Sequence, residues 1–146
     1  MPVASKLPRK FAEGTTVAAG KTRIEIEDLL KKAGGTSFMH AQKPGLAMLQ
    51  FNLRMRIIRF TLKVPDEATQ AAEHRRVWRV LLLTLRAKLE SVRDETVETF
   101  EEAFLAQTVP PDGGATVAER MLPQLRDAYA GRAPQMFLTL PSGPTR

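Results

Sequence analysis

The stretch AMLQFNLRMRIIRFTLKV (residues 47–64) changes its alternation halfway and so decides the fold. Apolar residues first occupy odd positions, from Ala47 to Leu53, and then even positions, from Ile58 to Val64. Alternation with a period of two is typical of half-buried strands, and a two-residue turn between antiparallel strands changes the parity in this way. The stretch therefore predicts a β-hairpin that turns at Met55 and Arg56.

This turn position sets which residues face each other. Opposed residue numbers then sum to 111, so that Phe51 faces Phe60 and Leu49 faces Leu62 on one apolar face. Methionine and arginine are unfavourable in a tight primed turn, because its residues need positive φ. A four-residue loop that keeps the same register is therefore an alternative.

The residues before the hairpin predict a helix and a first strand. Thr22 and Glu25 have the spacing of a capping box, and apolar residues follow at helical spacing up to residue 33. Gly34 accepts the left-handed conformation that ends a helix. Residues 36–42 then predict a short strand, and residues 43–45 a turn.

The residues after the hairpin predict a long amphipathic helix from about residue 66 to residue 93, capped by either Asp66 or Thr69. Its apolar stripe consists of Trp78, Leu81, Leu82, Leu85, Leu89 and Val92. This stripe complements the apolar face of the hairpin. The sequence therefore predicts an α+β fold, in which a small antiparallel sheet of three strands, including the hairpin, packs on the long helix.

The last third of the chain is predicted to be helical. Thr99 with Glu102 and Thr116 with Glu119 repeat the capping-box spacing, and the PPDGG segment (residues 110–114) separates the two helices. Pro123 implies a kink or two abutting helices, and the second helix ends at Gly131. We expect a single domain over residues 21–140, a flexible arm over residues 1–20 and a disordered tail over residues 141–146.

The composition indicates a globular protein of the cytoplasm. The chain has 146 residues, of which 43% are hydrophobic and 26% charged, and it contains no cysteine. No apolar run approaches a membrane span of about 18 residues, and the N-terminus lacks the apolar core of a secretory signal. We therefore expect no association with a membrane.

The charges are distributed very unevenly. The net charge is +6, and no acidic residue occurs between Leu29 and Pro65. Extended to Arg93, this basic middle holds thirteen basic and four acidic residues, a net charge of +9. Residues 94–119 hold seven acidic residues and no basic one. Such asymmetry favours a polyanionic partner, or a complementary surface on another copy or another protein.

Two groups of basic residues form the candidate site. Their members are Arg54, Arg56, Arg59 and Lys63 on the hairpin and Arg75, Arg76 and Arg79 at the start of the long helix. A basic two-stranded ribbon fits a major groove and reaches phosphates. We therefore expect a non-enzymatic accessory protein that binds DNA or RNA without regard to sequence. The alternative is a protein-interaction module, an assembly component or an inhibitor, whose basic middle meets residues 94–119 of a neighbouring copy in a homo-oligomer, or an acidic partner.

Catalytic chemistry has little support in the sequence. His40 and His74 are far apart, with no metal-ligand spacing around them. Gly20, Lys21 and Thr22 lack the first glycine and the preceding strand of a phosphate-binding loop. The acidic residues near position 100 are typical of a helix N-terminus. We expect no enzymatic activity, no cofactor and no metal site.

Two resemblances add to these expectations. The order helix, three strands, helix over about residues 22–93 resembles the double-stranded-RNA-binding domain, although the Gly-Pro-x-His loop motif of that family is absent. The segments TTVAAGKTRIEIEDLL, RFTLKVP, WRVLLLTLRAKLE, TFEEAFLA and PDGGATVAERMLPQL resemble a family of small tailed-phage and prophage proteins. That family brings no known activity. It implies a mobile-element context, in which small basic proteins often handle DNA or bind host machinery.

Overall fold

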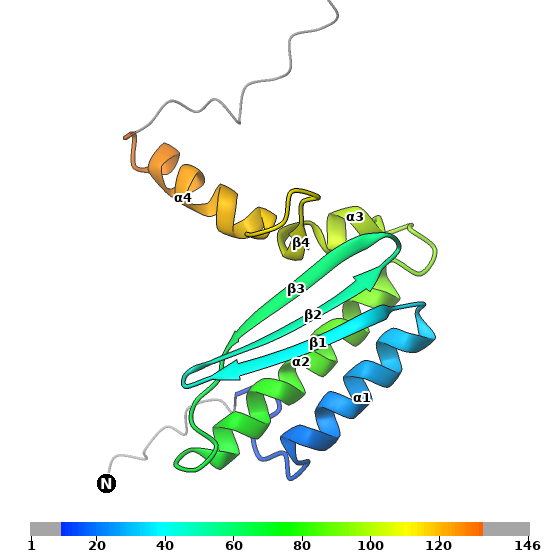
Figure 1. The fold of residues 1–146 in the computed structure, drawn as a ribbon, viewed down its shortest axis with the longest axis vertical. Coiled ribbons are helices and arrows are strands. Elements are labelled where there is room, and N and C mark those ends of the chain that lie inside the picture. Colours follow the sequence, from blue (N-terminus) through cyan, green and yellow to red (C-terminus); the bar gives the residue numbers. More distant parts are fainter. Residues whose placement is uncertain (1–9, 133–146) are drawn as a thin grey trace, which may run out of the picture.

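Four antiparallel strands form one sheet in this computed structural model, which describes residues 10–132 (Figure 1). In sheet order they are β1 (Thr36–Lys43), β2 (Leu46–Leu53), β3 (Arg56–Lys63) and β4 (Thr108–Val109). The predicted α+β class and the three predicted strands are confirmed. The two-residue strand β4 is an addition, because a segment this short has no readable alternation. It pairs with β3 through Ile57 and Val109.

Two helices cover one face of the sheet. They are α1 (Ala19–Lys32) and α2 (Ala71–Ser91). Figure 1 shows α1 running alongside β1, at the edge of the sheet, and α2 behind the strands. The remaining helical elements are α3 (Phe100–Ala103), the 3₁₀ turn η1 (Leu105–Gln107) and α4 (Val117–Tyr129). Within residues 10–132, no helix is both long and apolar enough to cross a membrane.

The core lies between the apolar sheet face and α2. Phe51, Ile58, Trp78, Leu82 and Leu85 are fully buried. Burial of a large apolar side chain contributes roughly 1.5–3 kcal/mol relative to leaving it in water. The apolar side chains of the hairpin thus form one side of the core, and the predicted apolar stripe of the long helix forms the other.

The hairpin register differs from the predicted one by two residues. Phe51 faces Ile58 and Leu49 faces Phe60, so opposed numbers sum to 109. The turn residues are Arg54 and Met55, with φ of 46° and 63°, as in a type I′ turn. A slip of two leaves every side chain on its original face, so burial cannot distinguish the two registers. The predicted turn at Met55 and Arg56 is therefore wrong by one residue, and the alternative of a four-residue loop is wrong as well.

The predicted helix starts are partly confirmed. Thr99 and Glu102 form a complete capping box, and Thr116 Oγ1 accepts a hydrogen bond from the backbone N–H of Glu119. The cap at Thr22 is wrong, because α1 begins three residues earlier and buries that side chain inside the helix.

The long helix also lacks its predicted cap. Neither Asp66 nor Thr69 caps α2, which begins at Ala71 with Gln70 as its N-cap residue and no side-chain cap bond. The helix α4 is a single element that includes Pro123. The helix ends before Gly131, whose φ of 70° is readily adopted by glycine because it has no Cβ.

The predicted N-terminal arm overlaps ordered parts of the fold. Its last two residues belong to α1, and the backbone carbonyls of Phe11 and Thr15 accept hydrogen bonds from α2. Residues 1–9 and the predicted tail, residues 141–146, lie outside the described residues.

Candidate interaction surface

The arginines at the tip of the hairpin bind the acidic segment of the same chain. Arg54 donates to Glu95 at 3.1 Å and also lies 5.1 Å above the ring of Phe100. Arg56 donates to Glu101 at 2.8 Å. Three of these four side chains are about half exposed and that of Glu101 is 70% exposed, so each pair contributes about 0–1 kcal/mol. The opposite charges that the sequence separates therefore meet within one molecule.

Arg59 holds the segment before α4 against the outer face of the sheet, the face that does not contact α2. Its Nη1 donates to the carbonyl of Gly114 at 2.6 Å, and its Nε donates to Gln50 Oε1 at 3.0 Å. Gln50 and Arg59 face each other in the observed register. Lys63 is exposed at the end of β3, and no ion pair to it is found among residues 10–132.

The basic residues at the start of α2 are also engaged internally. Arg76 donates two hydrogen bonds to Glu73, at 2.9 and 2.7 Å. These bonds lower the pKa of Glu73 and raise that of Arg76. Arg79 donates to Glu25 at 2.9 Å and so joins α2 to α1, while Arg75 donates to the carbonyl of Thr15 at 3.4 Å. These residues tie the helices and the N-terminal segment together.

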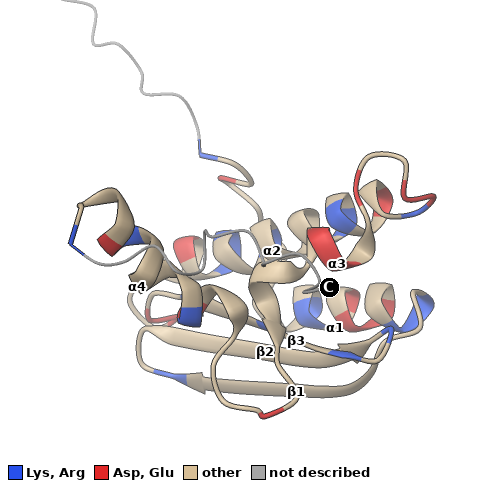
Figure 2. Ribbon diagram, turned by 90° about the horizontal axis from the view of Figure 1, so that it is seen from above, with Lys and Arg blue, Asp and Glu red and all other residues tan. Residues whose placement is uncertain are grey.

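The structure does not bring the two predicted groups into one basic patch. The hairpin tip lies near α3, whereas the first turn of α2 lies at the opposite end of the sheet (Figure 1). Figure 2 shows basic and acidic segments interspersed over the helices and loops. Among the predicted site residues, Lys63 is left with its charge free of a carboxylate or carbonyl partner within the described part of the chain.

The open edge of the sheet is a feature that was not predicted from the sequence. Strand β1 pairs with β2 on one side, and no described strand pairs with its other side. Lys43 and Leu46 flank a tight turn of Pro44 and Gly45, so their backbone groups bond to each other. Along an antiparallel pair, every second residue of a strand bonds to the partner strand, and the residues between them point the other way. Counting back from Lys43, His40 and Gln42 direct their backbone N–H and C=O groups away from β2.

A groove runs along this edge, between β1 and α1. Its volume is about 470 Å³, and its lining residues are Gly20, Arg23, Ile24, Glu27, Phe38, Met39, His40 and Leu49. Ile24 and Met39 are more than half exposed, at 62% and 54%. The surface therefore combines free backbone groups with accessible apolar side chains.

The middle of β1 carries no charge. Residues 38–42 contain one ionisable side chain, that of His40, and burial, with the nearby charge of Arg23, lowers its pKa and so favours its neutral form. Natural edges are usually protected by charges, bulges or prolines. Here such features occur only at the ends of the strand, as a bulge at Ser37 (φ 57°) and as Lys43 with Pro44.

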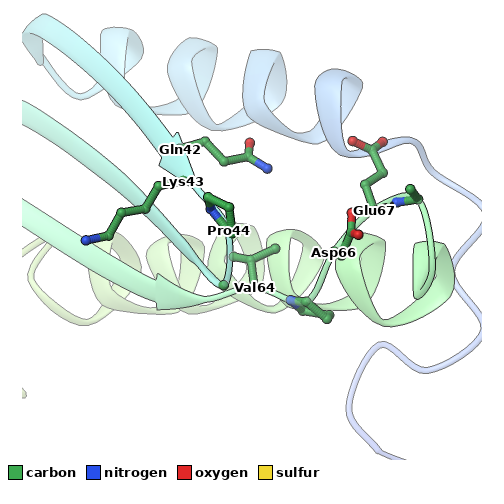
Figure 3. A pocket seen from close by; sticks show the side chains of 9 residues that line it. Gln42, Lys43, Pro44, Val64, Asp66 and Glu67 are labelled. Carbon is green, nitrogen blue, oxygen red and sulfur yellow. Dashed lines mark hydrogen bonds between the residues drawn. The ribbon is translucent and has the colours of Figure 1, made fainter.

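A second hollow lies beside the β1–β2 turn (Figure 3). Its volume is about 670 Å³, and it is lined by Lys43, Asp66 and Glu67 among others. Figure 3 shows the Lys43 side chain extending away from both carboxylates. The buried His74 nearby bonds through Nδ1 to the carbonyl of Pro65 at 2.9 Å, and its Nε2 lies 3.8 Å from Glu67. Residues 10–132 contain no group of three or more carboxylate or imidazole side chains suited to a metal ion.

Comparisons with known protein families, with curated proteins and with solved structures found no match. Any functional conclusion therefore depends on the geometry of this chain.

The signal for the open edge was present in the strand order. The first strand of an antiparallel meander has one neighbour unless a later strand joins it, and the only later strand among residues 10–132, β4, joins β3 instead.

Proposed function

We propose that this protein is a non-enzymatic protein-interaction module that binds its partner by strand addition to β1. The observation that supports this proposal is the open edge of β1, whose middle lacks acidic and basic residues other than His40, beside the groove along α1. An extended segment placed there would bond to the outward backbone groups of His40 and Gln42. Backbone hydrogen bonds supply affinity in this mode of recognition, and side-chain pockets supply specificity.

The groove explains how a partner would be selected. Alternate side chains of an added strand point to the two faces of the sheet. Those on the helix side would enter the groove against Ile24, and those on the outer side would lie near Met39. A partner strand with apolar residues at alternate positions fits these surroundings. Each backbone hydrogen bond adds about 1 kcal/mol net, so apolar contacts are needed for lasting binding.

A proline substitution provides the test. Gln42→Pro removes an outward N–H and keeps the bonds of β1 to β2, because prolines are tolerated at solvent-facing positions of edge strands. Random short peptides displayed on phage would be selected on the wild type, on Gln42→Pro and on the matched control Gln42→Ala. We expect extended, alternately apolar peptides to be enriched on the wild type and on Gln42→Ala only. Enrichment that is equal on all three proteins, or absent from all while the wild type is monomeric, would refute strand addition.

Nucleic-acid binding is the second candidate, and the outer face of the sheet supports it. Lys43 and Lys63 lie on either side of Leu46 in neighbouring strands, and no ion pair to either lysine occurs within residues 10–132. Arg59 lines the adjoining hollow with Lys43, although Glu119 lines it as well. Phosphates bound at this face would not compete with the ion pairs of the hairpin tip.

Salt dependence tests this second candidate. If Lys43 and Lys63 each contact a phosphate of duplex DNA, replacing both by alanine should make the log–log salt slope of binding shallower by about two. Arg54→Ala with Arg56→Ala removes two charges that are already paired with glutamates, so this control should leave the slope nearly unchanged. Gel shifts at several salt concentrations would measure both. Wild-type protein that does not bind DNA or RNA at low salt would eliminate this candidate.

A further inference from the structure

We infer that the strand added to β1 is the β1 strand of a second copy, so that the protein forms a two-fold dimer with one continuous sheet. This inference rests on the proposed function and names its partner. Three independent features of the described residues support it: the composition of the strand, the order of charges along α1, and the different character of the two sheet edges.

Strand β1 can pair with the β1 strand of a second copy. Antiparallel pairing about an axis through His40 brings outward backbone groups of one copy opposite those of the other, since outward residues recur at every second position. Residues 38–42 contain no lysine, arginine, aspartate or glutamate, so the pairing opposes no such like charges. Lys43 lies at the end of the strand, away from the axis.

The charges of α1 are also self-complementary. On the side of α1 that lines the groove, Arg23 precedes Ile24, and Glu27 follows one turn later. A two-fold axis that makes the strands antiparallel makes the neighbouring helices antiparallel as well. Arg23 of one copy then faces Glu27 of the second copy, and the exposed Ile24 side chains approach each other near the axis.

Arg23 and Glu27 can exchange their present contacts for the new ones. Glu27 pairs with Lys31 at 3.0 Å, but both side chains are about half exposed. Arg23 lies 5.3 Å from the ring centre of Trp78, and no carboxylate pairs with it within the described residues. Stable interfaces bury about 1,200–2,000 Å² in total, more than a few strand residues supply. The contribution of α1 is therefore required.

The two edges of the sheet differ in a way that favours a closed dimer. A two-fold contact uses β1 of both copies and leaves β3 at each end of the combined sheet, where β4 covers only Ile57 and Ile58. β4 has two residues and is followed by Pro110 and Pro111, which lack a backbone donor. The rest of this edge, residues 59–63 of β3, carries the charges of Arg59 and Lys63, which oppose further pairing, so the two-fold contact closes at two copies.

Sedimentation velocity over a wide dilution series tests the inference. We expect the wild type to sediment as a dimer that dissociates on dilution. Arg23→Glu places two like charges at each of the two symmetric contacts and should weaken the dimer roughly tenfold or more. Combining it with Glu27→Arg reverses both charges and should restore most of the affinity. Arg86→Glu, an exposed arginine of α2 outside the groove lining, should sediment as the wild type does.

Further variants separate the possible occupants of the edge. Gln42→Pro should yield a monomer with an unchanged far-UV circular dichroism spectrum. A monomeric wild type overturns the inference. If truncation after Arg132 then produces a dimer, the occupant of the edge is the chain's own segment 133–146. A dimer that is insensitive to both Arg23→Glu and Gln42→Pro also overturns the inference, because it uses another surface.

The proposed function can survive such a failure. A monomeric wild type that still enriches peptides dependent on Gln42 retains strand addition and excludes only the second copy as the partner. A monomer that enriches no such peptides contradicts both proposals.

Discussion

Arg79 donates a 2.9 Å hydrogen bond to Glu25, and this ion pair joins α2 to α1 across 54 positions of the sequence. Both side chains are mostly shielded from water, with exposed fractions of 23% and 29%. Shielding strengthens the attraction relative to a surface pair, and it also makes removal of one partner more costly. The contact helps set how α1 lies beside the open edge of the sheet.

A double-mutant cycle measures this ion pair. We expect a coupling free energy of roughly 0.5–1.5 kcal/mol between Arg79→Ala and Glu25→Ala in urea unfolding, above that of an exposed pair. Arg93 and Glu90, which are exposed and 3.4 Å apart, serve as the matched control and should couple by less than about 0.5 kcal/mol. Equal coupling in the two cycles would show that shielding of the first pair has no effect on stability.

The packing of the stacked rings of Phe51 and Phe60 predicts how strongly a cavity in the core would destabilise the protein. Their centroids are 6.4 Å apart, and Phe51 is completely buried. We expect Phe51→Ala to lower the free energy of unfolding by about 3–5 kcal/mol, because it leaves a cavity between sheet and helix. Met55→Ala, at a position that is 95% exposed, should change it by less than about 0.5 kcal/mol. Near-wild-type stability of Phe51→Ala would mean that this sheet face is not the core.

The hydroxyl of Thr22 provides a different test of packing. The side chain is fully buried, and Oγ1 has no hydrogen-bond partner within the described residues. Thr22→Val keeps the shape and removes the unsatisfied oxygen, so the free energy of unfolding should stay constant or rise by up to about 1 kcal/mol. Thr22→Ser keeps the oxygen and loses a methyl group, and it should be destabilising by about 1 kcal/mol. The opposite order of the two variants would reveal a bond to the hydroxyl.

The bonds between Arg76 and Glu73 predict a pH dependence. The hydrogen bonds from Arg76, and then its charge and that of Lys10, hold the pKa of Glu73 below its ordinary value in the folded protein. A depressed folded pKa stabilises the protein above the unfolded pKa, and this contribution is lost as the pH falls through the folded value. Glu73→Gln should therefore narrow the difference in stability between pH 7 and the acid range. In Arg76→Gln, NMR titration should show the pKa of Glu73 returning toward its ordinary value.

The sequence predicted those features that depend on local patterns. Alternation identified the hairpin and its buried face, and the stripe from Trp78 to Val92 identified the inner face of α2. The register escaped prediction because a slip of two residues conserves both faces. The cap at Thr22 failed because a threonine followed by a glutamate three positions later also occurs inside a helix, where the hydroxyl can be buried.

The candidate site was harder to predict because its decisive contacts are distant in sequence. The glutamates that pair with Arg54, Arg56 and Arg79 are 41, 45 and 54 positions away. A count of charges along the sequence identifies basic and acidic segments, but it does not show which residues form ion pairs in the folded chain. The free edge of β1 depends on strand order, and two residues of β4 determine which edge is covered.

The shortness of β4 also affects how the chain opens. Two residue pairs attach it to β3, and they lie about fifty positions away from their partners in the sequence. Such a ladder contributes little protection against opening, and the helix that follows contacts mainly η1. We therefore expect residues 108–132 to open as a unit, with loss of the bond from Arg59 to Gly114, while the hairpin and the two long helices stay folded. A protease that cuts after arginine should reach Arg120 and Arg126 in this open form long before it reaches the arginines of the sheet.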